Sequence, residues 1–237
     1  MEKRKVIIVG GGFGGLLAAK EFKDTDFDVT IIDKTNHHLF QPLLYQVAAA
    51  ALSPADIAIP IRSVFGDQKN IKVLLDEVIS VDKENNTIKL TGSELKFDYL
   101  ILSPGARHSY FGNDIWENFA PGLKTLSDAL KIRELILNSL EEAEKESDVT
   151  RRKKHLNFVV IGGGPTGVEL AGAIAEIAKK TMIRDYKNFR ADDTNIMLIE
   201  ALPRILTSYT PDLSEKAKED LVQMEVEVRL NTKVTDV

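Results

Sequence analysis

The sequence contains no cysteine among its 237 residues and only one tryptophan. Without cysteine, this stretch of chain cannot form a disulfide, a cysteine-ligated metal site or a redox-active thiol pair. Its four histidines lack metal-ligand spacing, so no metal site is predicted. These absences exclude thiol relays and zinc chemistry from residues 1–237.

Long hydrophobic runs and an excess of positive charge are also missing. No apolar run approaches the length of a membrane helix, and the N-terminal stretch leads directly into a predicted strand without signal-peptide features. The net charge of −5 argues against non-specific nucleic-acid binding. The basic run at residues 151–154 is interpreted as a solvated loop. With 43% hydrophobic residues, the chain can build ordinary globular cores.

The stretch from Lys5 to Asp33 is typical of strand, glycine turn, helix and second strand. Val6–Val9 is a short apolar run, as expected of a parallel strand. Gly10 permits a tight turn, Gly12 lets a pyrophosphate approach the backbone, and Gly15 lets the helix lie close to the strand. The helix N-terminus then points its free N–H groups at the phosphate. The pattern predicts a dinucleotide site; the alternative is a glycine-rich turn in another α/β protein.

An acidic residue follows the glycine motif at about the expected spacing. Asp33 ends the second strand eighteen residues after Gly15, where a carboxylate can accept hydrogen bonds from a ribose diol and would repel a 2′-phosphate.

The same plan appears again later in the chain. Residues 156–161 predict another buried strand, followed by Gly162, Gly164 and Gly167 and an alanine-rich helix. Glu200 ends the next strand 33 residues after Gly167, beyond the usual interval of about 20. Residues 182–193 are therefore expected to form an inserted loop or short helix, and Glu200 is a less secure ribose ligand than Asp33.

Two dinucleotide sites in one chain predict electron transfer between two cofactors, a flavin and a nicotinamide. The protein's task would be to set nicotinamide C4 against flavin N5, because the hydride chemistry belongs to the cofactors. Since the chain has no thiol pair, the electrons are expected to pass directly to a diffusible acceptor or partner.

The remaining elements are less distinctive. Residues 70–90 predict a small antiparallel β unit, and residues 97–102 predict a buried strand that ends in a Pro-Gly turn. Residues 125–145 have the spacing of an amphipathic helix. Residues 232–237 are interpreted as a strand-like piece. The Gly-rich, Pro-containing crossover near residues 112–122 predicts two domains, 1–115 and 116–237.

The sequence resembles the type II NADH dehydrogenases, single-subunit FAD-containing NADH:quinone oxidoreductases. The resemblance rests on VIIVGGGFGGL at the start, NHHLFQPLLYQVA from Asn36, and FVVIGGGPTGVELAGAIAE from Phe158. It runs along essentially the whole chain. It implies an α/β fold with two Rossmann-like dinucleotide-binding domains, the first for FAD and the second for NADH.

The resemblance also implies roles for particular residues. For FAD it implies Gly10, Gly12, Phe13, Gly14, Gly15, Asp33 and Lys34, with Val78 near the adenine and Gln46 and Gly105 toward the flavin. For NADH it implies Gly162, Gly164, Thr166, Gly167 and Glu200. Glu169 stands at the family position of an acidic residue beside nicotinamide and flavin; the alternative is a carboxylate in the first helical turn that interacts with the helix dipole.

Two departures from the family pattern accompany this resemblance. Ser103-Pro104-Gly105 stands where the family commonly has Ala-Thr-Gly, which changes the flavin contact. The chain also stops inside the nicotinamide domain, before the family's quinone-facing residues and C-terminal membrane-binding region. We therefore expect an N-terminal portion of a longer enzyme. That parent would lie in the cytoplasm, docked on the inner face of the cell membrane, and could form a homodimer.

Three functions remain open from the sequence. The first is hydride transfer from NADH to FAD and then electron transfer to a membrane quinone. The second is a soluble NADH:ferredoxin or rubredoxin reductase, and the third is an inactive nucleotide-binding fragment.

Overall fold

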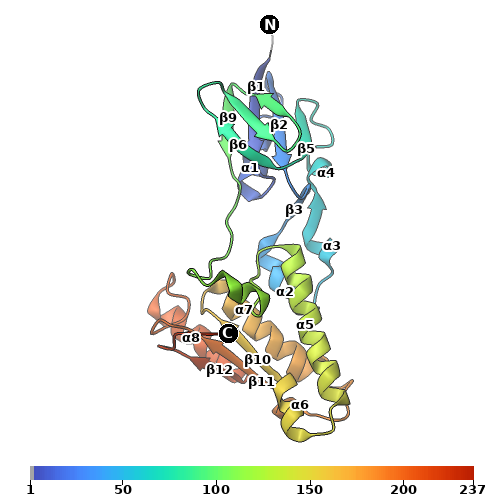
Figure 1. Cartoon of the computed structure of the whole chain (residues 1–237), viewed down its shortest axis with the longest axis vertical. Coiled ribbons are helices and arrows are strands. Elements are labelled where there is room, and N and C mark those ends of the chain that lie inside the picture. The colour runs from blue at the N-terminus through green and yellow to red at the C-terminus, as the bar shows by residue number, and fades with distance from the viewer. Residues whose placement is uncertain (1–2) are drawn as a thin grey trace. The chain divides into compact units, whose positions relative to one another are not determined.

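The computed structural model describes residues 3–237, and the chain divides into two compact units. The first unit comprises Met1–Phe40 and Ala55–Arg107, and the second comprises Gln41–Pro54 and His108–Val237. Residues 41–54, which the sequence analysis placed in the first domain, thus pack with the second unit. Each unit contains one parallel sheet with helices against it (Figure 1).

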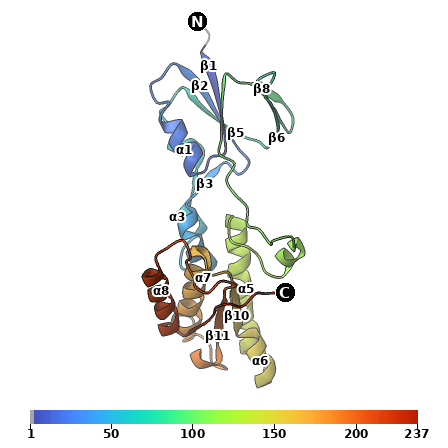
Figure 2. The same cartoon turned by 90° about the vertical axis from the view of Figure 1, so that its left-hand side faces the viewer.

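The first unit carries most of the strands. Its elements are β1 (Arg4–Val9), α1 (Phe13–Lys20), β2 (Phe27–Asp33), β3 (His37–Leu39), α3 (Pro54–Ile57), β4 (Ala58–Pro60), α4 (Ile61–Val64), β5 (Ile71–Leu75), β6 (Val78–Asp82), β7 (Thr87–Leu90), β8 (Glu94–Lys96) and β9 (Tyr99–Leu102). The parallel sheet has the order β5-β2-β1-β9, and β6, β7 and β8 form a separate antiparallel sheet. Figure 2 shows α1 on one side of the parallel sheet and β6 and β8 on the other.

Alternation along the strands explains these two layers. Val6, Ile8 and Ile31 point to one face and pack with Leu16 of α1. Ile7, Val9 and Ile32 point to the opposite face, where Ile88 and Leu90 of β7 cover them. Residues 6–9 of β1 are therefore all apolar, because both faces of the strand are buried there.

The second unit is richer in helices. Its elements are a 3₁₀ turn (Gln41–Leu43), α2 (Leu44–Ala48), a 3₁₀ helix (Asp114–Asn118), α5 (Leu126–Lys145), α6 (Val149–His155), β10 (Asn157–Ile161), α7 (Pro165–Glu176), a π-helical turn (Ile177–Thr181), a 3₁₀ turn (Ala191–Asp193), β11 (Asn195–Ile199), α8 (Pro211–Gln223) and β12 (Val226–Arg229). The parallel sheet has the order β10-β11-β12.

The predicted amphipathic helix is confirmed as α5. The Thr125 hydroxyl accepts a hydrogen bond from the Asp128 N–H, and the Asp128 carboxylate accepts one from the Thr125 N–H, so a capping box starts the helix. Residues spaced three and four apart are buried, and α5 packs against α2. The buried residues are Ala129, Ile132, Ile136, Leu140 and Ala143.

Several local expectations were wrong. The basic run at residues 151–154 lies in α6, because the Asp148 side chain caps the helix by accepting the Arg151 N–H. Residues 71–75 join the parallel sheet as β5, so the antiparallel unit starts only at Val78. Residues 232–237 form no strand.

Two strands that were expected to be buried are only partly so. In β10, Val160 is buried whereas Val159 and Ile161 are exposed, and in β9 both Tyr99 and Leu102 are exposed. Each strand is the outermost of its sheet in the described structure, which leaves its free edge without a neighbour.

Candidate functional site

The glycine turn of the first unit joins β1 to α1. Gly10 has a φ of +97°, a conformation that favours glycine, and its N–H donates to the Ile32 carbonyl at 2.8 Å. A Cβ on Gly15 would lie 1.8 Å from the Gly10 carbonyl oxygen. Only glycine at position 15 therefore lets the helix begin in direct contact with the turn.

The Asp33 carboxylate holds this turn in place. Its Oδ2 accepts the Gly11 N–H at 2.7 Å, and its Oδ1 accepts the Thr35 N–H and hydroxyl and the Asn36 N–H at 2.7 to 2.9 Å. Burial raises the pKa of Asp33, but these hydrogen bonds to the carboxylate outweigh burial, and the net effect lowers the pKa. Asp33 is therefore ionised at neutral pH.

Open space lies beside the turn where a phosphate would bind. A Cβ built on Gly12 would meet no atom within 4 Å, and Gly12 precedes the first turn of α1. The N–H groups of the first helical turn have no partner within the helix, and they favour an anion. The geometry fits the pyrophosphate of a dinucleotide.

Other predicted residues of the first site lie at varying depths. Lys34 is exposed directly after β2, and Val78 is half-buried at the start of β6, against the core that contains Val9. Gly105 has a φ of +78° in the turn after β9. The Ser103 hydroxyl of that turn donates to the Val9 carbonyl at 2.9 Å, which ties the turn to β1.

An aromatic group stands at the start of α1. The Phe13 ring makes edge contacts with His38, at a centroid distance of 4.9 Å, and with Phe40, at 5.6 Å. His38 Nδ1 also lies 3.2 Å from the Gly11 carbonyl oxygen. From the sequence, Phe40 was interpreted as ordinary packing, and the segment that holds His37 and His38 as a place where a flavin ring could be covered; their contact with Phe13 was not predicted.

The second unit reproduces the turn with nearly the same dimensions. Gly162 has a φ of +103°, and its N–H donates to the Ile199 carbonyl at 2.8 Å. A Cβ on Gly167 would lie 1.9 Å from the Gly162 carbonyl oxygen, and one on Gly164 would meet nothing within 4 Å. Thr166 follows in the exposed first turn of α7.

Glu200 occupies the position of Asp33 despite its longer interval. Its Oε2 accepts the Gly163 N–H at 2.6 Å and its Oε1 accepts the Leu202 N–H at 2.7 Å. The residues that lengthen the interval between Gly167 and Glu200 form the π-helical turn and the connection that follows it. β11 and Glu200 therefore have the same positions in the second unit as β2 and Asp33 in the first.

The middle glycine of each triplet was overlooked. A Cβ on Gly11 would lie 2.2 Å from the Ile61 side chain, and one on Gly163 would lie 2.7 Å from the Ile205 side chain. Both glycines also donate their N–H to the acidic residue. The repeated run of three glycines was the signal that could have found them.

Similarity to known proteins identifies the family to which this fold belongs. Residues 4–237 match the model of the pyridine nucleotide-disulphide oxidoreductase family. The chain belongs to this family. Its predicted fold class, with two dinucleotide-binding α/β units, is confirmed.

Type II NADH:quinone oxidoreductases are among the relatives of this family member. The chain is 45% identical to NdhA and 44% identical to Ndh, both from Mycobacterium tuberculosis, over 99% of its residues and 51% and 52% of theirs. The structure of NDH2 from Plasmodium falciparum in complex with NADH matches with a TM-score of 0.92 and 31% identity, over 99% of this chain and 49% of that one. The predicted resemblance is confirmed, and the chain spans about half the length of the curated relatives it matches.

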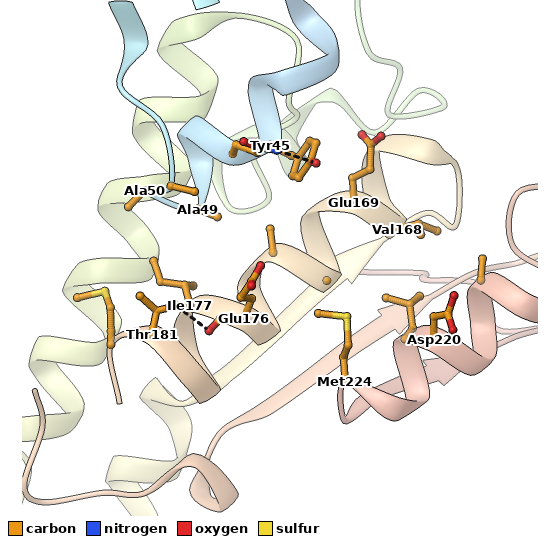
Figure 3. Close-up of a pocket in the computed structure, with 17 residues that line it drawn as sticks. Tyr45, Ala49, Ala50, Val168, Glu169, Glu176, Ile177, Thr181, Asp220 and Met224 are labelled. Atoms are coloured by element: carbon orange, nitrogen blue, oxygen red, sulfur yellow. Dashed lines mark hydrogen bonds between the residues drawn. The ribbon is translucent and has the colours of Figure 1, made fainter. Parts of the chain in front are cut away.

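The second unit also contains a hollow of about 680 Å3 beside α7 (Figure 3). It is lined by Tyr45 and Gln46 of α2, the three alanines at 49–51 that follow α2, one face of α7, the π-helical turn and α8. Glu169 lies toward one end and Thr181 toward the other. Gln46 donates to the Tyr45 hydroxyl at 3.0 Å in the wall that α2 provides.

The position of Glu169 in α7 rules out one of the two interpretations of this residue. No acidic residue lies in the first turn of α7, so the interpretation as a first-turn carboxylate was wrong. Glu169 is largely exposed, and its partial burial raises its pKa, which is the direction that suits a group handling protons.

Neither a membrane helix nor a metal cluster is found in the described part of the chain. Within residues 3–237, no helix is both long enough and apolar enough to cross a bilayer. The same residues contain no group of three or more histidine and acidic side chains placed to hold a metal ion.

Proposed function

We propose that this chain supplies the FAD- and NADH-binding units of an NADH:quinone oxidoreductase. The observation that carries the proposal is the repetition of one nucleotide turn, with the Gly11–Asp33 bond in the first unit and the Gly163–Glu200 bond in the second. The names of the mycobacterial relatives support quinone as the acceptor.

In this proposal the first unit holds FAD and the second holds NADH. Gly10, Gly12, Phe13, Gly14 and Gly15 surround the FAD pyrophosphate, and the Asp33 carboxylate accepts a ribose hydroxyl. The remaining FAD contacts within this unit come from Lys34, Val78 and Gly105, whereas Gln46, which was expected toward the flavin, belongs to the second unit. When bound, the flavin accepts hydride from NADH and passes two electrons onward.

For NADH we assign the equivalent positions of the second unit. The pyrophosphate is held by Gly162, Gly164, Thr166 and Gly167. The Glu200 carboxylate accepts hydrogen bonds from the ribose hydroxyls. Because a carboxylate repels a 2′-phosphate, the site is expected to favour NADH over NADPH. Glu169 would stand near the nicotinamide, where its raised pKa suits proton exchange.

The experiment is anaerobic spectroscopy of the purified chain with added FAD. A flavin spectrum that NADH bleaches, and that a short-chain quinone but not ferredoxin restores, supports the proposal; NADPH should bleach it with a much higher apparent KM. Gly164→Ala is the informative variant, because a Cβ at this position meets no atom within 4 Å, and its methyl group should hinder the NADH phosphate while leaving FAD bound.

Other outcomes select the alternatives. Restoration by ferredoxin alone favours the soluble reductase, and failure to bind either nucleotide favours the inactive fragment. Docking on the inner face of the membrane and dimerisation belong to the parent protein in this proposal, and flotation of that protein with lipid vesicles tests the first.

A further inference from the structure

The middle glycine of each turn is fixed at more than one point. In the first unit the Gly11 N–H donates to the Asp33 carboxylate at 2.7 Å, and in the second the Gly163 N–H donates to the Glu200 carboxylate at 2.6 Å. In both units an isoleucine side chain also packs where a Cβ would stand on that glycine. The N–H and the Cα of the middle glycine are therefore held in the same way in both units.

The carbonyl oxygen of the middle glycine is also held in both units, but by different kinds of donor. His38 Nδ1 lies 3.2 Å from the Gly11 carbonyl oxygen, within the range of a hydrogen bond. The Leu206 N–H donates to the Gly163 carbonyl at 2.7 Å. Both donors lie in the segment after the acidic residue, yet one is a side chain and the other a backbone group. The two turns thus share a fixed carbonyl, although the group that fixes it differs.

The elements that place these donors differ as well. In the first unit β3 pairs antiparallel with β4, and Ile61 directly follows β4. This two-stranded sheet therefore places the His38 imidazole at the Gly11 carbonyl and leads to the Ile61 side chain at the Cα of the same glycine. In the second unit the adjacent residues Ile205 and Leu206 supply both contacts.

A fixed carbonyl sets the direction of the next N–H group. The Gly11 carbonyl and the Gly12 N–H belong to one trans peptide group, whose C=O and N–H bonds point in opposite directions. With the carbonyl held on His38, the Gly12 N–H must point away from the imidazole, and open space lies beside Gly12. Gly163 and Gly164 stand in the same relation in the second unit.

The contact also defines where the His38 ring carries its proton. A carbonyl oxygen only accepts hydrogen bonds, so Nδ1 must be the donor. The neutral ring then has its proton on Nδ1, with Nε2 as an acceptor. The Phe13 ring packs against the imidazole edge to face, at a centroid distance of 4.9 Å and an interplanar angle of 86°. His38 is therefore held beside the turn as a hydrogen-bond donor.

We propose that His38 is a positioning residue for the dinucleotide of the first unit. Its Nδ1–H holds the Gly11 carbonyl and thereby directs the Gly12 N–H toward the pyrophosphate. The proposal rests on the proposed function in taking FAD as the ligand of this unit. In the second unit the Leu206 N–H has the same task for NADH, so that turn needs no side-chain donor.

The test compares His38 variants that differ in where they offer an N–H group. His38→Asn keeps an N–H at about the position of Nδ1, His38→Gln moves it to about that of Nε2, and His38→Leu removes it. All three lose the ring that packs against Phe13, so differences among them report the donor. His37→Leu is the matched control, because His37 faces the other side of β3 and its Nδ1 lies 3.0 Å from the Thr35 carbonyl oxygen.

Fluorescence titration with FAD is the first measurement. His38→Leu and His38→Gln should weaken FAD binding by about fivefold, the loss expected for one hydrogen bond, whereas His38→Asn should stay within about twofold of wild type. His37→Leu should bind FAD as wild type does. NADH affinity should not change in any variant, because a backbone N–H holds the Gly163 carbonyl. Equal FAD affinities of the Asn and Leu variants overturn the proposal, since packing alone would then explain the loss.

The second measurement needs no ligand. In the ligand-free chain at pH 8, the 15N chemical shifts of the His38 ring should show the proton on Nδ1. A proton on Nε2 overturns the proposal whatever the affinities, because the ring could then not donate to Gly11. A wild-type chain that has the Nδ1 proton but binds no FAD contradicts the proposed function instead, and the role of His38 toward FAD falls with it.

Discussion

The Gly11 N–H donates a 2.7 Å hydrogen bond to the Asp33 carboxylate, so the acid proposed to bind a ribose already fastens the glycine turn to the second strand. A carboxylate offers about four lone-pair positions. Gly11 uses one on Oδ2, and the Thr35 and Asn36 donors occupy Oδ1. Oδ2 therefore retains capacity for a ribose hydroxyl, and the same side chain can serve both the fold and the ligand.

Asp33→Asn should destabilise the first unit at pH 7. The amide group keeps only one acceptor atom, so its NH2 faces a backbone donor on one side; we expect a loss of about 1–3 kcal/mol in unfolding free energy. Because the folded pKa of Asp33 is lowered, its stabilisation is present above the unfolded value and is lost as pH falls through the folded pKa.

Urea unfolding at pH 7 and at pH 3 and below measures this effect. The difference between wild type and variant should shrink steadily with acidification. Asp26→Asn, at an exposed surface ion pair with Lys3, is the control and should change little. A variant as stable as wild type at pH 7 would contradict the role given to Asp33.

Gly15→Ala and Gly12→Ala should separate folding from ligand binding. The added methyl group at position 15 would lie 1.8 Å from the Gly10 carbonyl oxygen, so the turn must shift, at a cost of about 3 kcal/mol. At position 12 it enters open space at an ordinary φ of −74°, so only the poorer N-cap preference of alanine counts, and stability should fall by less than about 1 kcal/mol.

FAD titration followed by fluorescence completes this comparison. Gly12→Ala should weaken FAD binding by about tenfold, or 1.4 kcal/mol, because the methyl group occupies the phosphate approach. Wild-type affinity in the Gly12 variant would show that the phosphate binds elsewhere.

Glu169→Gln should raise thermal stability at alkaline pH. Because burial raises the folded pKa of Glu169, the ionised carboxylate costs stability above that pKa, and the neutral amide removes the cost. Below the unfolded pKa both side chains are neutral, so the Tm difference should be positive at pH 8 and vanish near pH 4. Differential scanning calorimetry across this range measures it; a negative difference at pH 8 would show that Glu169 has a stabilising partner when charged.

Thr125→Ala should lower the stability of the second unit by about 1 kcal/mol, because the capping box at the start of α5 loses its hydroxyl acceptor. Ser127→Ala, in the exposed first turn of the same helix, is the control. Chemical unfolding followed by far-UV circular dichroism compares them. Equal midpoints for the two variants would mean that the cap contributes nothing measurable.

Much of the nucleotide geometry could be predicted from the sequence because steric needs fix it. The glycines at positions 10, 12 and 15 were expected for separate steric reasons, and the structure provides those reasons at Gly10 and Gly15. Asp33 was expected at a strand end because the eighteen residues from Gly15 to Asp33 are enough for one helix and the strand that follows it. Glu200 was less secure because a loop of unknown shape intervened, yet its strand end fixed it in the same place.

Other features depend on contacts that a sequence pattern does not specify. The apolar residues of β1 and β10 are alike in sequence. Nothing in them indicates that only β1 is covered on both faces. The edge contacts of Phe13 with His38 and Phe40 require the loop after β2 to fold back over the turn. Asp148, as an N-cap residue, could have indicated that a helix contains the basic run. The charge of the run was instead interpreted as typical of a solvated loop.

The excursion of residues 41–54 into the second unit means that the backbone passes between units three times, after residues 40, 54 and 107. Neither unit can be expressed intact from one uninterrupted piece of coding sequence. A single protease cut at any one crossing would leave the other two as covalent tethers, so nicked protein should still migrate as one particle in gel filtration.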